Sequence, residues 1–153
     1  MNECDTYKTL KNTSEGLYKE KGSKFIALAF PVQTEEEIKA LQEDIRKKYH
    51  DARHHCYAYR LGFEGEMWRA NDDGEPSNSA GQPILGQIRS AGLTNVMIIV
   101  IRYFGGTKLG VGGLINAYRT ATAEAIQANV IEKRLVKDIY QLDFPYEAMN
   151  AVM

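Results

Sequence analysis

Six consecutive apolar residues, Val96–Ile101, constrain the fold of this chain more than any other stretch. Five of the six are β-branched, and such a run is typical of a central strand that is covered on both faces. The glycine-rich segment Gly105–Gly113 follows it, and apolar periodicity then predicts a helix near Leu114–Gln127. The expected centre of the domain is therefore a buried strand, a glycine segment and a helix.

The remaining elements alternate along the chain. Thr34 and Glu37 form a capping box that predicts a helix start. Its inner face is expected to carry Ile38, Leu41, Ile45 and Tyr49. Short strands are expected at Tyr7–Leu10, Leu17–Glu20, Phe25–Val32, His54–Leu61 and Met67–Arg69. Ser79 and Gln82 are expected to cap a further helix that ends near Gly92. Strands followed three times by a helix predict an α+β two-layer sandwich, with the helices gathered on one sheet face.

Composition excludes several classes of protein. Apolar residues make up 44% of the chain and charged residues 25%, which excludes a disordered chain. Nineteen Lys and Arg face twenty Asp and Glu, so the net charge of −1 argues against strong nonspecific binding to nucleic acids. No apolar run approaches the roughly 20 residues that span a bilayer, and the first residues lack a signal-peptide pattern. We expect a cytoplasmic protein with two reduced cysteines that does not bind membranes.

The glycine segment has two interpretations. Its backbone amides, with Lys108 beside them, are suited to an anion or phosphate group. Alternatively, the glycines mark a tight backbone crossing. The sequence fails both the P-loop pattern, which needs Lys after Gly110, and the dinucleotide pattern, which Ile115 breaks. The residues expected at an anion site are Arg102, Gly105, Gly106, Thr107, Lys108, Gly110, Gly112 and Gly113.

Two further clusters carry weaker signals. His54 and Cys56 share one face of their strand and allow a metal pair or a thiol–base pair, but a half-buried histidine and a core thiol are the simpler interpretation. Asp72, Asp73 and Glu75 allow a magnesium site or a set of turn-forming residues. His54, Cys56 and Asp73 are the weak catalytic candidates, and we expect neither a metal nor another cofactor.

Five motifs resemble the IMPACT family, including its bacterial YigZ-like branch, in the family's order. They are Lys21-Gly22-Ser23-Lys24-Phe25, residues 52–59 (ARHHCYAY), residues 71–77 (NDDGEPS), residues 80–84 (AGQPI) and residues 102–110 (RYFGGTKLG). Two positions depart from the family pattern. Ser77-Asn78-Ser79 stands where relatives tend to have Gly and Thr, and Val111 stands where a small or hydroxyl residue is usual. The family-signature surface comprises Arg53, His54, Asp72, Asp73, Glu75 and Tyr103.

The resemblance implies a fold similar to the second domain of small-subunit ribosomal protein S-five, with a left-handed βαβ crossover. It implies an N-terminal domain over 1–136. Residues 137–153 would then begin a truncated ferredoxin-like domain, similar to the last domain of elongation factor G. On pattern alone, Val136–Phe144 is an expected strand that equally well completes the first sheet. The apolar side chains of this tail also predict either disorder or a homodimer through the C-terminal segment.

Three functions remain open. The favoured one is a binding module in translation or its regulation, acting on RNA, the ribosome or a protein partner, because the resemblance links eukaryotic relatives to translation initiation. The second is an enzyme acting on a phosphorylated small molecule through the glycine segment. The third is a structural interaction domain. We expect a basic patch at Arg102 and Lys108 in the first case, and a pocket that joins the glycine segment to Asp72 and Asp73 in the second.

Overall fold

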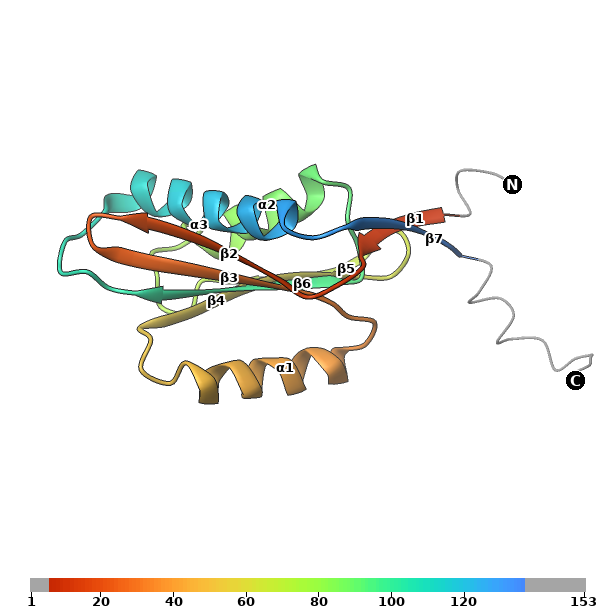
Figure 1. Cartoon of the computed structure of the whole chain (residues 1–153), viewed down its shortest axis with the longest axis horizontal. Coiled ribbons are helices and arrows are strands. Elements are labelled where there is room, and N and C mark those ends of the chain that lie inside the picture. Colours follow the sequence, from red (N-terminus) through yellow and green to blue (C-terminus); the bar gives the residue numbers. More distant parts are fainter. Residues whose placement is uncertain (1–5, 137–153) are drawn as a thin grey trace, which may run out of the picture.

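A five-stranded antiparallel sheet is the centre of the structure, a computed structural model that describes residues 6–136 (Figure 1). The strands are β1 (Thr6–Leu10), β2 (Ser14–Glu20), β3 (Ser23–Pro31), β4 (His54–Leu61), β5 (Met67–Asn71), β6 (Val96–Tyr103) and β7 (Ile131–Leu135). The helices are α1 (Glu35–Lys48), α2 (Gly81–Ser90) and α3 (Gly110–Gln127). The expected α+β class is confirmed.

Strand β6 lies in the middle of the sheet, whose order is β2-β3-β6-β4-β5. It pairs antiparallel with β3 on one side and with β4 on the other, so Arg102 lies opposite Phe25 and His54. Strands β3 and β4 therefore run parallel, with β6 between them and α1 connecting them. The expected central strand is confirmed, whereas the left-handed crossover stays a prediction.

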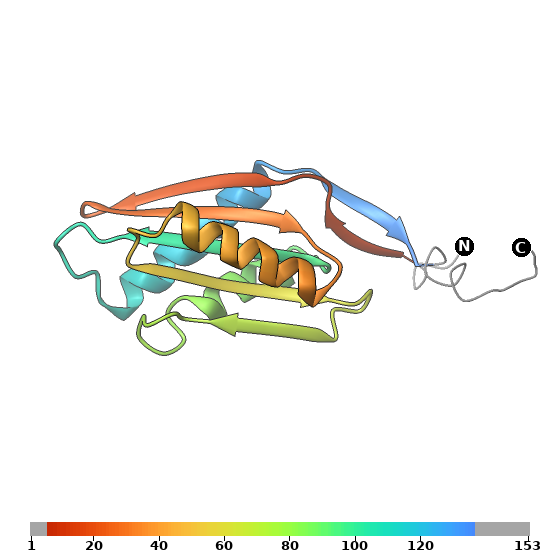
Figure 2. The same cartoon turned by 90° about the horizontal axis from the view of Figure 1, so that it is seen from below.

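Helices cover both faces of the sheet. Helices α2 and α3 pack on one face, over a core that includes Ala27, Cys56 and Val100. Helix α1 covers the other face, where Ile38 and Ile45 join a second core (Figure 2). Helices α2 and α3 thus share a face as expected, and α1 is the exception. The reason lies in β6, whose side chains are apolar on both faces and need cover on both.

Helix starts show where local sequence is decisive. At α1, Thr34 Oγ1 accepts from the Glu37 amide at 3.1 Å and the Glu37 carboxylate accepts from the Thr34 amide at 3.1 Å, which confirms the capping box. At α2 the expected Ser79 cap is wrong, because its hydroxyl donates to the Pro76 carbonyl. The amides of Ala80 and Gly81 donate instead to the Asp72 carboxylate, which caps α2 from the preceding loop.

A separate two-stranded ribbon, β1 with β7, projects from one end of the sheet (Figure 1). The two strands pair antiparallel from Thr6 with Leu135 to Leu10 with Ile131. The sequence pattern placed a strand at Val136–Phe144, whereas the described strand ends at Leu135 and Val136 lies in a turn. The expected second domain, its truncation and the homodimer through it fall on residues 137–153, outside the described residues.

Candidate functional site

A row of three side chains crosses the sheet at the carboxyl end of β6. Phe25, Arg102 and His54 lie directly opposite one another on β3, β6 and β4, so they share the face under α3. The Arg102 guanidinium lies 5.5 Å from the centre of the Phe25 ring and is 5% exposed. Burial of a cation to this degree needs a counter-charge.

Glu75 supplies that charge from the loop between β5 and α2. Arg102 Nη1 donates to both Glu75 carboxylate oxygens, at 2.9 and 2.8 Å. From α3, the Tyr118 hydroxyl donates to Glu75 Oε2 at 2.5 Å. Glu75 therefore ties the acidic loop to the central strand and to α3. Arg102 Nε is buried without a hydrogen-bond partner among the described residues.

His54 adjoins this network in a fixed orientation. Its Nδ1 lies 2.7 Å from the carbonyl oxygen of Asp73, which can only accept, so Nδ1 carries the proton. Its Nε2 lies 3.5 Å from Glu75 Oε1. The imidazole is thus held between a carbonyl and a carboxylate, with its side chain 15% exposed.

Cys56 and Tyr118 lie beneath the network as neutral donors. Burial raises the pKa of the Cys56 thiol, and the Sγ atom donates to the Asp72 carbonyl at 3.0 Å. Burial, and then the neighbouring thiol and Glu75, raise the pKa of the Tyr118 hydroxyl. A buried thiol that stays protonated is no nucleophile, so the structure favours the core-thiol interpretation of Cys56. Sequence reasoning placed Tyr118 on the inner helix face but gave it no role.

We expect Cys56 to resist thiol reagents in the native protein. In a Cys4→Ser variant at about pH 8, a thiol with the unperturbed pKa of about 8.5 would react, whereas one whose pKa burial has raised would not. Ellman's reagent should detect no thiol in native buffer and one per chain in denaturant. Stoichiometric reaction of the folded protein at the same rate as in denaturant would contradict the burial of Cys56.

A cavity of about 380 Å³ opens beside the network. It is lined by Arg53, His54, Glu75, Pro76, Arg102, Phe104, Lys108, Leu109, Gly110, Val111 and Leu114. Arg53 and Lys108 bring positive charges with no ion-pair partner within residues 6–136, and the Arg53 guanidinium stacks 4.7 Å from the centre of the Phe104 ring. The lining therefore combines cationic side chains with apolar ones such as Leu109, Val111 and Leu114.

The amino end of α3 faces this cavity. Leu109 is the N-cap and makes no side-chain hydrogen bond, and the first turn holds no acidic residue. The first amides of α3 are therefore uncapped, and the positive end of the helix dipole has no counter-charge from its own turn. Together with Lys108, this end of α3 is suited to one anionic group.

The glycines of the segment 105–113 differ in their surroundings. A Cβ at Gly105 would overlap the backbone of Gly22, and the Gly105 amide donates to Ser23 Oγ, so Gly105 is a packing position. Gly106 and Gly110 have positive φ angles of 91° and 75°. Within residues 105–113, the cavity is lined by Lys108, Leu109, Gly110 and Val111. Gly105, Gly106, Thr107, Gly112 and Gly113, expected at an anion site, lie outside its lining.

Three signature residues also lie away from the cavity. Asp72 caps α2, as described above. Asp73 Oδ2 accepts from the His55 amide at 2.7 Å and Oδ1 lies 3.4 Å from Arg46, so its carboxylate is occupied. The Tyr103 hydroxyl donates to Asp51 at 2.9 Å, and Tyr103 packs against the core under α1. The acidic loop therefore reaches the cavity through Glu75 and Pro76.

Two kinds of feature are not found in the described part of the chain. Between residues 6 and 136, no three His, Cys, Asp or Glu side chains are grouped to hold a metal ion. In the acidic loop, the carboxylates of Asp72, Asp73 and Glu75 each bond a different part of the structure. Within the same range, no helix is both long and apolar enough to cross a membrane.

Comparison with known families decides the relationship. The model of the Impact N-terminal domain matches residues 21–126, which is more than half of the chain. The chain belongs to the IMPACT family. This match contains the whole cavity, from Arg53 to Leu114, but neither strand of the β1–β7 ribbon.

Curated IMPACT-family relatives are similar over most of the chain. IMPACT family member YvyE of Bacillus subtilis is 38% identical, over 86% of this chain and 61% of its own length. IMPACT family member YigZ of Escherichia coli is 33% identical, over 86% of this chain and 66% of its own. The chain therefore spans less than two thirds of the length of either relative.

Two solved structures share the fold. One, described as the crystal structure of a hypothetical protein, superposes with a TM-score of 0.82 at 31% identity, covering 86% of this chain and 65% of that one. The other is the two-domain translational regulator Yih1, with a TM-score of 0.50 at 23% identity, covering 84% of this chain and 52% of that one. The second likeness concerns the fold alone.

Proposed function

We propose that this IMPACT domain is a binding module in the control of translation, and that it recognises a nucleotide phosphate of RNA in the cavity beside Glu75. One observation carries the proposal. Lys108, Arg53 and the uncapped end of α3 line one cavity together with apolar side chains. The cationic groups suit a phosphate, and the apolar side chains suit the sugar or base of the same nucleotide.

The charge distribution favours recognition of a single group over a broad basic surface. Arg102, expected on an exposed patch, is buried and its charge is balanced by Glu75. Lys108 and Arg53 remain as the two unbalanced cations of the cavity. Few phosphate contacts and a net charge of −1 correspond to weak nonspecific binding and a shallow salt dependence.

The link to translation comes from relatives. The solved neighbour Yih1 is named as a translational regulator. The resemblance described in the sequence analysis also implies a link to translation initiation. The whole relatives are longer than this chain, so the proposal concerns the domain described above. The proposal is that the domain binds RNA, and it makes no statement about how binding changes translation.

Lys108→Glu is expected to weaken RNA binding at least about tenfold, because it removes a charge-assisted contact and repels the phosphate. Lys108 is exposed and has no ion-pair partner in the described range, so stability should change by no more than about 0.5 kcal/mol. Fluorescence anisotropy with a short single-stranded RNA in low salt measures the effect.

Lys39→Glu provides the matched control for this charge reversal. Lys39 is exposed on α1, which covers the opposite face of the sheet from α3. It changes the net charge equally, so it should leave RNA affinity within about twofold if the cavity is the site. Equal loss of affinity in both variants, or in neither, would refute the cavity as the RNA site.

A second candidate function rests on His54. The Asp73 carbonyl fixes its Nδ1–H, and its ring lines the cavity with Nε2 3.5 Å from Glu75 Oε1. A histidine at a cavity wall favours an enzyme acting on a phosphorylated small molecule, in which Nε2 would exchange the proton. This function predicts that mononucleotides bind as tightly as RNA in the same titration. It also predicts that incubation with the protein converts one of them to a product. Tighter binding of RNA without turnover favours the binding module.

A further inference from the structure

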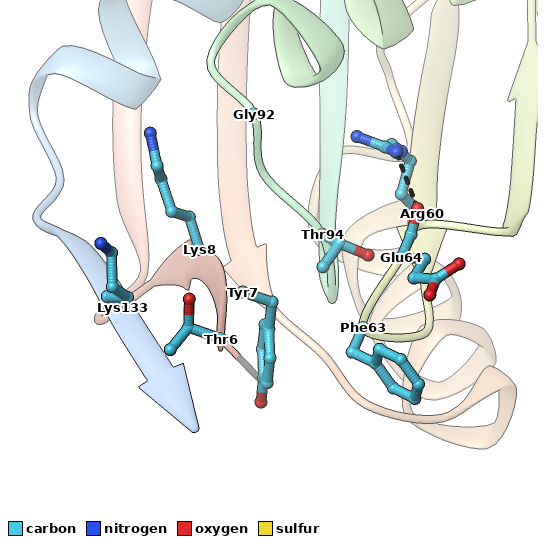
Figure 3. A pocket seen from close by; sticks show the side chains of 9 residues that line it. All are labelled: Thr6, Tyr7, Lys8, Arg60, Phe63, Glu64, Gly92, Thr94 and Lys133. Atoms are coloured by element: carbon cyan, nitrogen blue, oxygen red, sulfur yellow. Dashed lines mark hydrogen bonds between the residues drawn. The ribbon is translucent and has the colours of Figure 1, made fainter. Parts of the chain in front are cut away.

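A second cavity, of about 340 Å³, lies at the opposite end of strand β4 from the Glu75 network. It is lined by Thr6, Tyr7, Lys8, Arg60, Phe63, Glu64, Gly92, Thr94 and Lys133 (Figure 3). His54 begins β4 and Arg60 lies near its other end, so the two cavities are about 20 Å apart along the strand.

Two lysines of this cavity are held side by side. Lys8 on β1 and Lys133 on β7 are directly opposite in the antiparallel ribbon, so their side chains share a face. Figure 3 shows both on one side of the cavity, where Lys8 Nζ approaches Gly92. Like charges directly opposite one another destabilise a ribbon, and an anion bound between them would remove this repulsion.

Arg60 provides a third charge from the other side of the cavity. Its guanidinium is fixed by two neutral acceptors, the carbonyls of Leu93 at 2.9 Å and Glu64 at 3.3 Å. Its Nε is buried with no hydrogen-bond partner in the described structure. Burial, and then the charge of Arg89, lower the pKa of Arg60, as expected for a partly desolvated cation near a like charge.

Compensating carboxylates are not paired with these cations. Glu64 is the one acidic residue in the lining, and its carboxylate points away from the two lysines (Figure 3). Across residues 6–136, none of Lys8, Arg60 and Lys133 forms a salt bridge with a carboxylate. The lining therefore holds three cations and one carboxylate, and none of the three cations is ion-paired within the described residues.

We propose that this cavity is a phosphate-binding site in which Lys8, Lys133 and Arg60 hold the phosphate group of a nucleotide. Lysine ammoniums and a rigid guanidinium are the groups that bind phosphate oxygens in proteins. The rings of Tyr7 and Phe63 in the same lining provide surfaces for the attached base. The site is independent of the cavity beside Glu75, because the two share no residue.

The test uses Lys133→Gln, with Lys39→Gln as the matched control and AMP, inorganic phosphate and a short single-stranded RNA as probes. Amide NMR shifts of Gly92, Leu93 and Thr94 report on this cavity separately from Lys108 and Gly110. We expect AMP to shift the first group in wild type, with a dissociation constant that rises about tenfold in Lys133→Gln and stays unchanged in Lys39→Gln.

A stability measurement separates binding from folding. Without ligand, Lys133→Gln should be at least as stable as wild type, because it removes the repulsion from Lys8. With phosphate at matched ionic strength, its gain in melting temperature should be smaller than that of wild type. Binding of RNA but not AMP at these amides would assign the phosphate to a polynucleotide, and a response to AMP would assign it to a free nucleotide. Equal responses of wild type and Lys133→Gln to every probe would overturn the proposal.

Discussion

Glu75→Ala is expected to lower the free energy of unfolding by about 3–5 kcal/mol, because it leaves the Arg102 guanidinium buried without its counter-charge. The same substitution removes the acceptor of the Tyr118 hydroxyl, a second buried polar group. Urea denaturation followed by circular dichroism measures the loss. Glu43→Ala, at an exposed position on α1, should change stability by no more than about 0.5 kcal/mol.

A double variant shows whether the unpaired charge is the cause. When Glu75→Leu is combined with Arg102→Met, both charges leave the interior together. Replacement of a whole buried pair by apolar residues is often neutral. The double variant should therefore be more stable than Glu75→Ala alone. A Glu75→Ala protein that stays within about 1 kcal/mol of wild type would show that Arg102 finds water or another partner.

Gly16→Ala is expected to destabilise the domain by about 3 kcal/mol, at the upper end of the cost of overpacking a core. Gly16 lies on β2 directly under α3, where Ser14 also donates to the Ala125 carbonyl at 2.6 Å. A Cβ at Gly16 would overlap the Ala125 amide nitrogen and lie 2.6 Å from the Ala121 carbonyl oxygen. Backbone atoms of a packed helix cannot move aside singly, so α3 has to shift as a whole.

Gly86→Ala is the matched control for this substitution. Gly86 is exposed within α2, and a Cβ there would meet nothing within 4 Å. Alanine is favoured over glycine in a helix interior by about 1 kcal/mol, so this variant should be more stable than wild type. Opposite signs for the two glycine substitutions, measured by the same denaturation, test the packing of α3 on β2. Similar stability of Gly16→Ala and wild type would contradict that packing.

Local sequence predicted those elements whose causes are local. The α1 capping box involves residues three apart, and β4 and β6 are set by runs of suitable residues. Periodicity also placed Ala117, Tyr118 and Ala121 on the buried face of α3. These features need no knowledge of distant partners.

The hydrogen-bond partners of buried polar residues could not be predicted from the sequence, because they come from distant parts of the chain. Arg102 was expected at an open anion site, yet it is buried and bonded to Glu75, which also accepts from Tyr118 on α3. Gly105 is a glycine because of Gly22, at the turn between β2 and β3, and nothing near Gly105 in sequence indicates that crossing. Sequence alone left the anion and packing interpretations open, and the structure shows that Gly105 is a packing position.

The second cavity was likewise hidden from sequence reasoning. Lys8 and Lys133 become neighbours only through the pairing of β1 with β7, and β7 itself was not expected. Each lysine alone is an ordinary exposed side chain. The alternating polar and apolar residues of each segment indicate a strand, but periodicity does not reveal which strands pair.

The β1–β7 ribbon also has a consequence for how the domain is made. Its two strands are separated by nearly the whole described chain, so closing it demands the largest loss of loop entropy in the fold. During synthesis β1 emerges first and can bond Thr94 and Asn95, but its ribbon partner β7 is complete only when Leu135 has left the ribosome. The five-stranded sheet has all its strands before then, since β6 ends at Tyr103. The ribbon is therefore a late step in folding, and its amides should exchange with solvent before those of β6.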